Sequence, residues 1–183
     1  MIPEARALLI TGKPGCGKTT LVRTVVEWSR ADAGGFYTEE IREDSERRGF
    51  RIVTLGGRSA VLSHVNIRGP YRVGRYGVDL AALEEVGVLA IRDAIARHEV
   101  VVIDEIGKME LLSPRFRQAV LESLGSGKKV LATVMLAVSP FASRLKSRAD
   151  VSVIVLDRAS WHRILGDVVV WLGGAKLNVA ARC

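Results

Sequence analysis

Eight consecutive residues near the N-terminus constrain this chain more than any other feature. They match the pattern G-x-x-x-x-G-K-[ST] at every fixed position and read Gly12, Lys13, Pro14, Gly15, Cys16, Gly17, Lys18 and Thr19. The apolar run at residues 7–11 predicts a buried strand, and residues 20–28 have the apolar spacing of a helix. A strand, a glycine-rich loop and a helix in this order form a phosphate cradle, because glycines let successive backbone N–H groups point at one anion.

The loop assigns chemistry to individual side chains. Lys18 is placed to reach the β- and γ-phosphates of a nucleotide, and the Thr19 hydroxyl to ligate Mg²⁺. We take the residues from Gly12 to Thr20 as the nucleotide-binding segment. The sequence therefore predicts binding of ATP, GTP or another nucleoside triphosphate together with Mg²⁺.

A second signal lies in the middle of the chain, where the apolar residues 100–103 are followed by Asp104 and Glu105. An apolar strand that ends in an acid supplies the metal partner of such a loop, so Asp104 is expected to hold Mg²⁺ through water beside Thr19. Glu105 is placed to orient or deprotonate a water near the γ-phosphate. We predict Lys18 and Glu105 as catalytic residues, with a strand-end cap and a surface acid as the structural alternatives for the two carboxylates.

The chain of 183 residues is long enough for one substantial domain, which we expect to span residues 1–183. No apolar run approaches the ~20 residues of a membrane helix. Residues 1–6 lack the basic-then-apolar layout of a signal peptide. We therefore expect a cytoplasmic protein that does not bind membranes. The two cysteines, Cys16 and Cys183, do not suggest a disulfide framework.

The formal net charge of +7 raises the question of nucleic acid as a partner. The basic residues are scattered, and there is no interleaving of aromatic and basic residues of the kind that stacks bases. We expect nucleoside triphosphates as the primary partner and a monomeric protein. Nucleic acid stays as a secondary alternative that only the net charge supports.

The order of elements predicts an α/β fold with helices on both faces of a mostly parallel sheet. After a break at Gly34 and Gly35, strands at residues 36–41, 50–55 and 60–65 form an antiparallel meander, because their links are too short for parallel crossovers. Residues 43–49 read as a charged turn and residues 68–77 as a loop. A helix at 79–97 begins with Asp79 as its N-cap, with Gly87 as a possible bend or break. The remaining elements are strands at 100–103, 129–134 and 151–156 and helices at 113–124, 139–146 and 160–172.

The run from Asp104 to Leu111, Asp-Glu-Ile-Gly-Lys-Met-Glu-Leu, resembles the signature of the small nucleoside-triphosphatase family described in thermophiles and as a human cancer-related NTPase. Residues 12–21, 35–42 and 73–79 and the pair Thr133-Val134 also resemble this family. The resemblance implies a P-loop NTPase three-layer sandwich and Mg²⁺-dependent hydrolysis of nucleoside triphosphates to diphosphate and phosphate, with broad base tolerance. The chain departs from the family at Asp157-Arg158, where an Asn-Arg pair is common. Arg158 matches the family arginine, but Asp157 stands in place of the asparagine and lacks its side-chain amide.

Some residues beside these motifs have both a functional and a structural interpretation. Lys108 and Glu110 are candidates for contact with the γ-phosphate region or for an ion pair that holds the loop. The Thr133 hydroxyl is a candidate sensor of the γ-phosphate or of the attacking water, although a β-branched residue is equally at home in a strand.

Three arginines are further candidates. Arg144 and Arg148 lie in or near a short helix, where either is a candidate arginine finger, with a solvated helix face as the alternative. Arg75 lies in a glycine-flanked loop from which it could reach the nucleotide. The histidines, which are far apart and lack metal-ligand spacing, are expected to be structural: His64, His98 and His162.

The sequence leaves three functions open. The first is hydrolysis of nucleoside triphosphates, with Glu105 directing water. The second is a nucleoside or small-molecule kinase that uses the same phosphate cradle, although kinases of this type often lack the glutamate. The third is a nucleotide-gated, RNA-associated ATPase, which only the charge supports.

Overall fold

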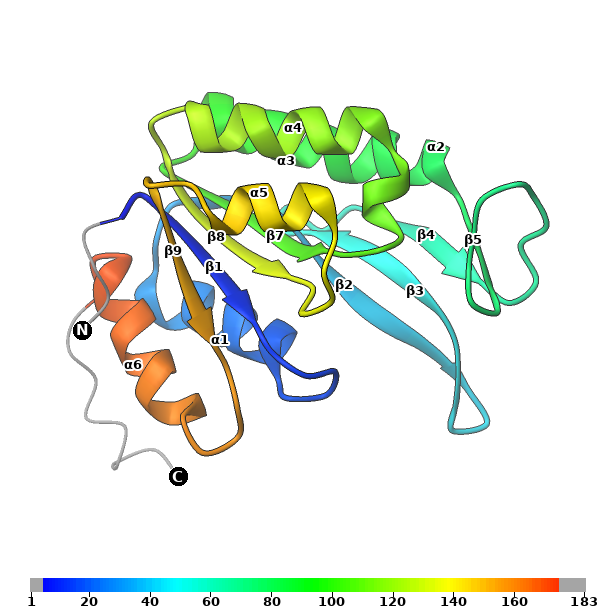
Figure 1. Cartoon of the computed structure of the whole chain (residues 1–183), viewed down its shortest axis with the longest axis horizontal. Helices are drawn as coiled ribbons and strands as arrows, with labels where there is room; N and C mark the ends of the chain where they lie inside the picture. The colour runs from blue at the N-terminus through cyan, green and yellow to red at the C-terminus, as the bar shows by residue number, and fades with distance from the viewer. Residues whose placement is uncertain (1–4, 175–183) are drawn as a thin grey trace.

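A computed structural model of the chain describes residues 5–174, so Cys183 lies outside the described residues. Within this part, one sheet of nine strands runs in the order β5-β6-β4-β3-β2-β7-β8-β1-β9 (Figure 1). The strands are β1 (Ala7–Thr11), β2 (Ala33–Glu43), β3 (Glu46–Thr54), β4 (Ser59–His64), β5 (Arg72–Val73), β6 (Tyr76–Val78), β7 (Val100–Ile106), β8 (Lys129–Val134) and β9 (Val151–Val155).

Helices cover both faces of the sheet, as predicted (Figure 1). One face carries α1 (Lys18–Ser29) and α6 (Trp161–Trp171). The opposite face carries α2 (Leu80–Ala82), α3 (Leu89–Arg97), α4 (Pro114–Gly125) and α5 (Pro140–Lys146). The result is the three-layer sandwich that the sequence predicted. No helix in residues 5–174 has the length and apolar character needed to cross a membrane.

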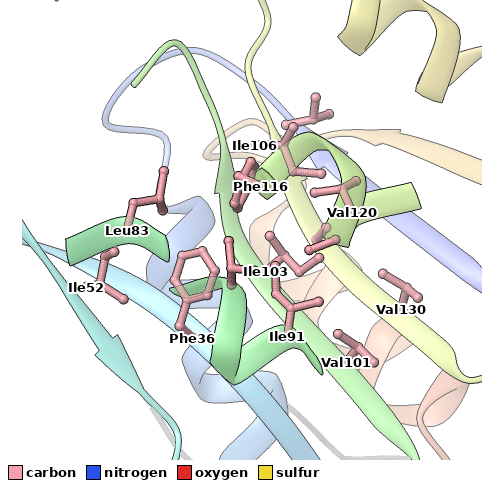
Figure 2. Close-up of a cluster of buried hydrophobic side chains, with 14 of the residues drawn as sticks. Phe36, Ile52, Leu83, Ile91, Val101, Ile103, Ile106, Phe116, Val120 and Val130 are labelled. Atoms are coloured by element: carbon pink, nitrogen blue, oxygen red, sulfur yellow. The ribbon is translucent and has the colours of Figure 1, made fainter. Parts of the chain in front are cut away.

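The central strands are buried on both sides, which explains their continuous apolar runs. In β7, Val101 and Ile103 pack into the core beneath α3 and α4, whereas Val100 and Val102 pack toward α1 and α6. Figure 2 shows the first of these cores, where Phe36 meets Phe116 edge-on. Strands β2, β7, β8, β1 and β9 run parallel, which brings their carboxyl ends to one edge of the sheet.

The antiparallel meander of β2, β3 and β4 is confirmed, but β2 is longer than predicted. The expected break at Gly34 and Gly35 is wrong, because both residues belong to the strand. Gly35 has φ of +112°, and a Cβ there would overlap the backbone of Val102 on β7. Gly35 therefore marks a close approach of two strands rather than a chain break.

Two segments expected to be irregular are partly strand. The charged turn predicted at residues 43–49 shrinks to Asp44 and Ser45, whose φ angles of +46° and +67° belong to a tight hairpin. The loop predicted at residues 68–77 contains β5 and most of β6, which pair with each other. Both segments lack a sustained alternation of apolar and polar residues, which was the signal for a strand.

The helix predicted at residues 79–97 is continuous, and Asp79 caps it by accepting a hydrogen bond from the Ala82 N–H over 2.9 Å. A π-helical segment, Leu83–Val88, lies between α2 and α3. It contains Gly87, so the expected bend or break takes the form of a locally widened helix.

Candidate functional site

The glycine-rich loop joins the carboxyl end of β1 to the first turn of α1. Gly15 and Gly17 have φ of +75° and +92°, a region that side chains disfavour. A Cβ at Gly12 would lie 2.5 Å from the Leu156 carbonyl oxygen and 2.8 Å from Sγ of Cys16, so the loop packs tightly against the segment after β9. No side chain caps α1, which leaves its first N–H groups free for an anion. The exposed members of the predicted segment are Lys13, Pro14, Gly15 and Thr20.

Trp161 supports this loop, although sequence reasoning missed it. Its indole Nε1–H donates to the Gly17 carbonyl oxygen over 3.2 Å. Cys16 is buried beside the same core, and its N–H donates to the Lys13 carbonyl oxygen over 3.2 Å. Trp161 is separated from Gly17 by 144 positions in the chain, so no local pattern distinguishes it from an ordinary core tryptophan.

Lys18 curls back over the loop that precedes it. Its Nζ lies 3.4 Å from the Gly12 carbonyl oxygen and 3.8 Å from Oε2 of Glu105. Only a tenth of its side chain is exposed. The two residues predicted as catalytic are therefore neighbours in space, with the ammonium group between the phosphate loop and the end of β7.

Asp104 is fully buried and receives three hydrogen bonds from different elements. The hydroxyl of Thr133 on β8 donates over 2.6 Å, that of Thr19 on α1 over 2.8 Å, and the backbone N–H of Thr38 on β2 over 3.4 Å. Burial raises the pKa of Asp104, while these donors and the charge of Lys18 act in the opposite direction. Thr19 and Asp104, which the sequence placed side by side at a Mg²⁺ site, are in contact, and Thr133 touches the same carboxylate. Their role in holding Mg²⁺ stays a prediction.

Glu105 follows inside β7, which continues to Ile106 instead of ending at residue 103 as predicted. The pairing of β7 with β8 shifts register between Ile103 and Ile106, and such irregularities re-aim side chains at the rims of sheets. Burial raises the pKa of Glu105, and Lys18 lowers it. The carboxylate stays partly exposed, so it can meet both Lys18 and solvent.

Glu110 lies in a 3₁₀ turn, Glu110–Leu112, between β7 and α4. Its side chain is buried, whereas Lys108 is exposed. Within residues 5–174 no ion pair joins the two, so the alternative of an ion pair that holds the loop is wrong, and contact with the γ-phosphate region stays a prediction. Burial raises the pKa of Glu110 to about 8, with the charges of Glu105 and Asp104 acting in the same direction.

The arginine candidates are not gathered around Lys18 by any contact in residues 5–174. Arg144 is exposed on α5, and Arg148 is paired with Asp150 at 2.8 and 2.6 Å. Arg158 is exposed in the segment between β9 and α6. Asp157, which replaces the family asparagine, accepts hydrogen bonds from the Ser160 N–H and hydroxyl over 2.7 Å each, and so shapes the turn before α6.

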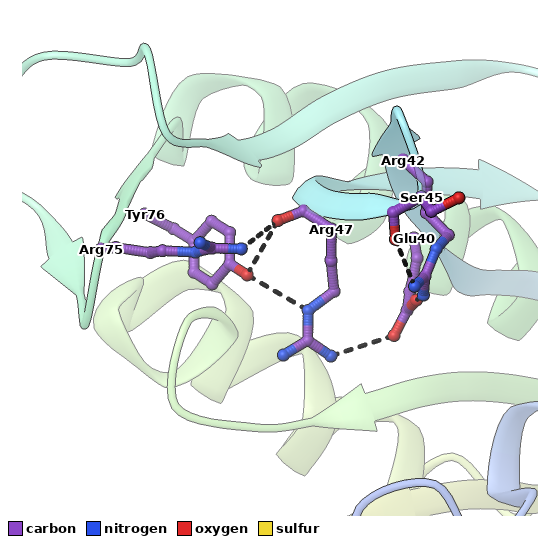
Figure 3. A network of polar contacts seen from close by, with 6 residues as sticks. All are labelled: Glu40, Arg42, Ser45, Arg47, Arg75 and Tyr76. Atoms are coloured by element: carbon purple, nitrogen blue, oxygen red, sulfur yellow. Dashed lines mark hydrogen bonds and ion pairs between the residues drawn. The ribbon is translucent and has the colours of Figure 1, made fainter.

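Arg75 belongs to a separate network on the meander, shown in Figure 3. Its guanidinium donates to the Arg47 carbonyl oxygen and lies over the Tyr76 ring. Arg47 in turn donates to the Tyr76 hydroxyl over 3.1 Å and to Glu40 over 3.0 Å. Arg75 thus pins the β5–β6 hairpin to β3.

The donor set suits a hard cation that binds few protein ligands. Thr19 Oγ1 and the Asp104 carboxylate lie within 2.8 Å of each other beside the phosphate loop, and Mg²⁺ favours such oxygen donors together with waters and phosphates. Residues 5–174 hold no cluster of three or more His, Cys, Asp or Glu side chains arranged for a metal. His98 pairs with Asp32 at 2.6 Å, and His64 lies 3.6 Å from Glu43.

Known proteins resemble the chain over nearly its whole length. It is 44% identical over 162 residues to the nucleoside-triphosphatase THEP1 of Thermotoga sp. (strain RQ2), which covers 88% of this chain and 92% of that protein. It is 39% identical over 181 residues to the Homo sapiens cancer-related nucleoside-triphosphatase, covering 90% and 95%. The crystal structure of THEP1 from the hyperthermophile Aquifex aeolicus superimposes with a TM-score of 0.82 at 36% identity, covering 91% of this chain and 98% of that one.

The model of the NTPase family matches residues 7–169, a range that includes the phosphate loop, both carboxylates of β7 and the turn that follows them. The fold, the loop geometry and these similarities agree, and the chain belongs to this NTPase family.

Proposed function

We propose that the protein hydrolyses nucleoside triphosphates, such as ATP and GTP, to nucleoside diphosphate and phosphate in a Mg²⁺-dependent reaction. The observation that carries the proposal is the 3.8 Å approach of Glu105 Oε2 to Lys18 Nζ, beside the bonded pair of Thr19 and Asp104. The Lys18 ammonium group, which would bind phosphate, and the partly exposed Glu105 carboxylate therefore lie next to each other at the carboxyl edge of the sheet. The names of the THEP1 and human relatives support the same reaction class.

The backbone and Lys18 provide the binding half of the site. The free N–H groups at the start of α1 would face the β- and γ-phosphates, and Lys18 would exchange its contact with the Gly12 carbonyl oxygen for a phosphate oxygen. Thr19 would hold Mg²⁺, with Asp104 behind it. When bound, the ion supplies positive charge that offsets the charge of the β- and γ-phosphates.

Glu105 provides the hydrolytic half. Its carboxylate would orient a water in line with the γ-phosphate and accept a proton from it. Burial raises its pKa, which makes it a better proton acceptor than an ordinary exposed glutamate, while the charge of Lys18 acts in the opposite direction. Thr133 contributes through Asp104, because its hydroxyl holds the metal-side carboxylate in place.

We further propose that the protein works as a cytoplasmic monomer on free nucleotides rather than on nucleic acid. Arg42 and Arg47 on the meander pair with Glu40, so part of the positive charge is already neutralised within the protein (Figure 3). Steeply salt-dependent stimulation of hydrolysis by RNA would contradict this choice of partner. A dimer mass in light scattering would contradict the monomer.

The test of hydrolysis measures phosphate release from ATP, GTP or CTP with Mg²⁺ and no acceptor. We expect Glu105→Gln to lower the rate about 10²–10⁴-fold while nucleotide binding persists. Glu99→Gln is the matched control, because Glu99 is exposed just before the other end of β7. Parent-like hydrolysis by Glu105→Gln would overturn the role of Glu105. Phosphate transfer only after addition of an alcohol or nucleoside would replace the hydrolase with a kinase.

A further inference from the structure

Glu110 is a buried carboxyl that the proposed reaction leaves without a role. It is 5% exposed, and within residues 5–174 Asp104 is the other acidic residue with so little exposure. No ion pair among the described residues offsets its charge. A buried carboxyl without a cation is costly unless it is neutral or well hydrogen-bonded. Backbone hydrogen bonds at Gly107 and Glu110 lower its pKa, but burial outweighs them, so its position needs an explanation.

Gly107 brings this carboxyl to Glu105. A Cβ at Gly107 would lie 2.8 Å from Oε2 of Glu110, and 3.4 Å from both Cγ and Oε1 of Glu105. The two carboxyl side chains therefore converge on the same small space, which exists because residue 107 has no side chain. We call this space the Gly107 slot.

The turn around the slot is hydrogen-bonded at both ends. The Leu111 N–H donates to the Gly107 carbonyl oxygen over 3.0 Å, and the Ser113 N–H to the Glu110 carbonyl oxygen over 3.1 Å. Ser113 then caps α4 through the Phe116 N–H over 3.0 Å. Glu110 is thus held next to the start of α4, so its side chain has a fixed place from which to contact a neighbour.

We propose that Glu110 is a positioning residue that fills the Gly107 slot and holds the Glu105 carboxylate toward Lys18 and the phosphate loop. This inference rests on the proposed hydrolytic role of Glu105. The raised pKa of Glu110, about 8, agrees with it, because a neutral carboxyl can lie against the Glu105 carboxylate without repulsion. An apolar side chain would fill part of the slot but offer no hydrogen-bonding group.

The test compares three variants by steady-state hydrolysis and by titration with a fluorescent nucleotide at pH 7. We expect Glu110→Met to lower kcat about 10–100-fold, the cost of a misplaced reactive group, with KM and nucleotide affinity near those of the parent. Glu110→Gln is neutral and of the same shape, so it should keep kcat within about threefold. Gly107→Ala should lower kcat as Glu110→Met does, because its methyl group enters the slot.

Glu84→Gln is the matched control, because Glu84 accepts a 2.7 Å hydrogen bond from Ser113 on the side of the π-helical segment. It should leave kcat unchanged. A parent-like kcat in folded Glu110→Met, or a rise in KM alone, would overturn the inference, as would a Glu110→Gln protein as slow as Glu110→Met. If Glu110→Met does not fold, a parent-like kcat in Gly107→Ala overturns it. A parent-like Glu105→Gln would instead refute the proposed function.

Discussion

Two polar networks in this protein use similar contacts in opposite surroundings. At the carboxyl edge of the parallel strands, Asp104 binds Thr19 and Thr133 out of contact with water. On the antiparallel meander, Glu40 binds Arg42 at 2.5 Å and Arg47 at 3.0 Å, and all three side chains are about half exposed. By their contact distances alone, the Glu40 network on the meander would be at least as strong as the Asp104 network.

Burial reverses that ranking. Water screens exposed ion pairs, which typically contribute ~0–1 kcal/mol each, whereas a buried carboxylate that loses a donor has no solvent to replace it. A polar group kept in the interior at such cost is the better candidate for function. The difference between the two networks therefore identifies Asp104 and Glu105 at the end of β7 as the candidates for function. The meander arginines are then exposed residues with a structural role.

The largest expected effect concerns Glu110 in the protein without nucleotide. Its pKa is about 8 in the folded protein against an ordinary 4.5, so the folded state binds more protons than the unfolded chain between these values. The free energy of unfolding of the parent should therefore fall as pH rises from about 4.5 through 8. Glu110→Gln lacks this titration, so it should gain a few kcal/mol relative to the parent between pH 5 and pH 9.

Urea unfolding of both proteins across this pH range measures the difference. Ionisable groups that do not interact with Glu110 are shared and cancel in the comparison, whereas the charges of Glu105 and Asp104 interact with it. A difference that stays constant with pH would show that Glu110 is not held neutral by its surroundings.

A smaller effect is expected for Thr133→Val, which removes one donor to the buried Asp104 while keeping the side-chain shape. We expect a loss of about 1.5–3 kcal/mol in the free energy of unfolding, the range for a hydrogen bond to a charged group. Thr133→Ser keeps the hydroxyl and loses a methyl group, so it serves as the control. A valine variant as stable as the parent would mean that the hydroxyl contributes nothing.

The smallest effect is expected on the meander. Glu40→Gln removes the shared partner of Arg42 and Arg47, yet it should change the free energy of unfolding by no more than about 1 kcal/mol. Hydrolysis should stay at the parental rate. A larger loss of stability or of activity would erase the distinction between the two networks.

The parts of the fold and site that could be predicted are those with a local signal. The loop from Gly12 to Thr19 and the apolar strand before Asp104 each consist of consecutive residues, so their patterns can be recognised in the sequence. Parallel strands bring their ends to one edge, so the meeting of Thr19 with Asp104 followed from topology. Thr133 was a candidate for the same reason, since β8 is the neighbour of β7.

The missed features depend on contacts between distant segments. Gly35 was read as a chain break because its close approach to Val102 cannot be seen in its neighbours. Trp161 and Thr38 reach the site from elements whose own patterns are ordinary. An ion pair between Glu110 and Lys108 was one of two alternatives, but Glu110 is buried and Lys108 is exposed. Burial is a property of the assembled core, so the sequence did not show it.

We propose that Glu105 is needed for the hydrolysis of a nucleotide that the loop binds without it. A single-turnover experiment separates hydrolysis from binding: excess protein is mixed with Mg²⁺ and labelled ATP, quenched in acid, and the nucleotide is separated. We predict that the parent converts its bound ATP to ADP, while Glu105→Gln holds intact ATP over the same interval. Conversion at the parental rate in Glu105→Gln would contradict the account.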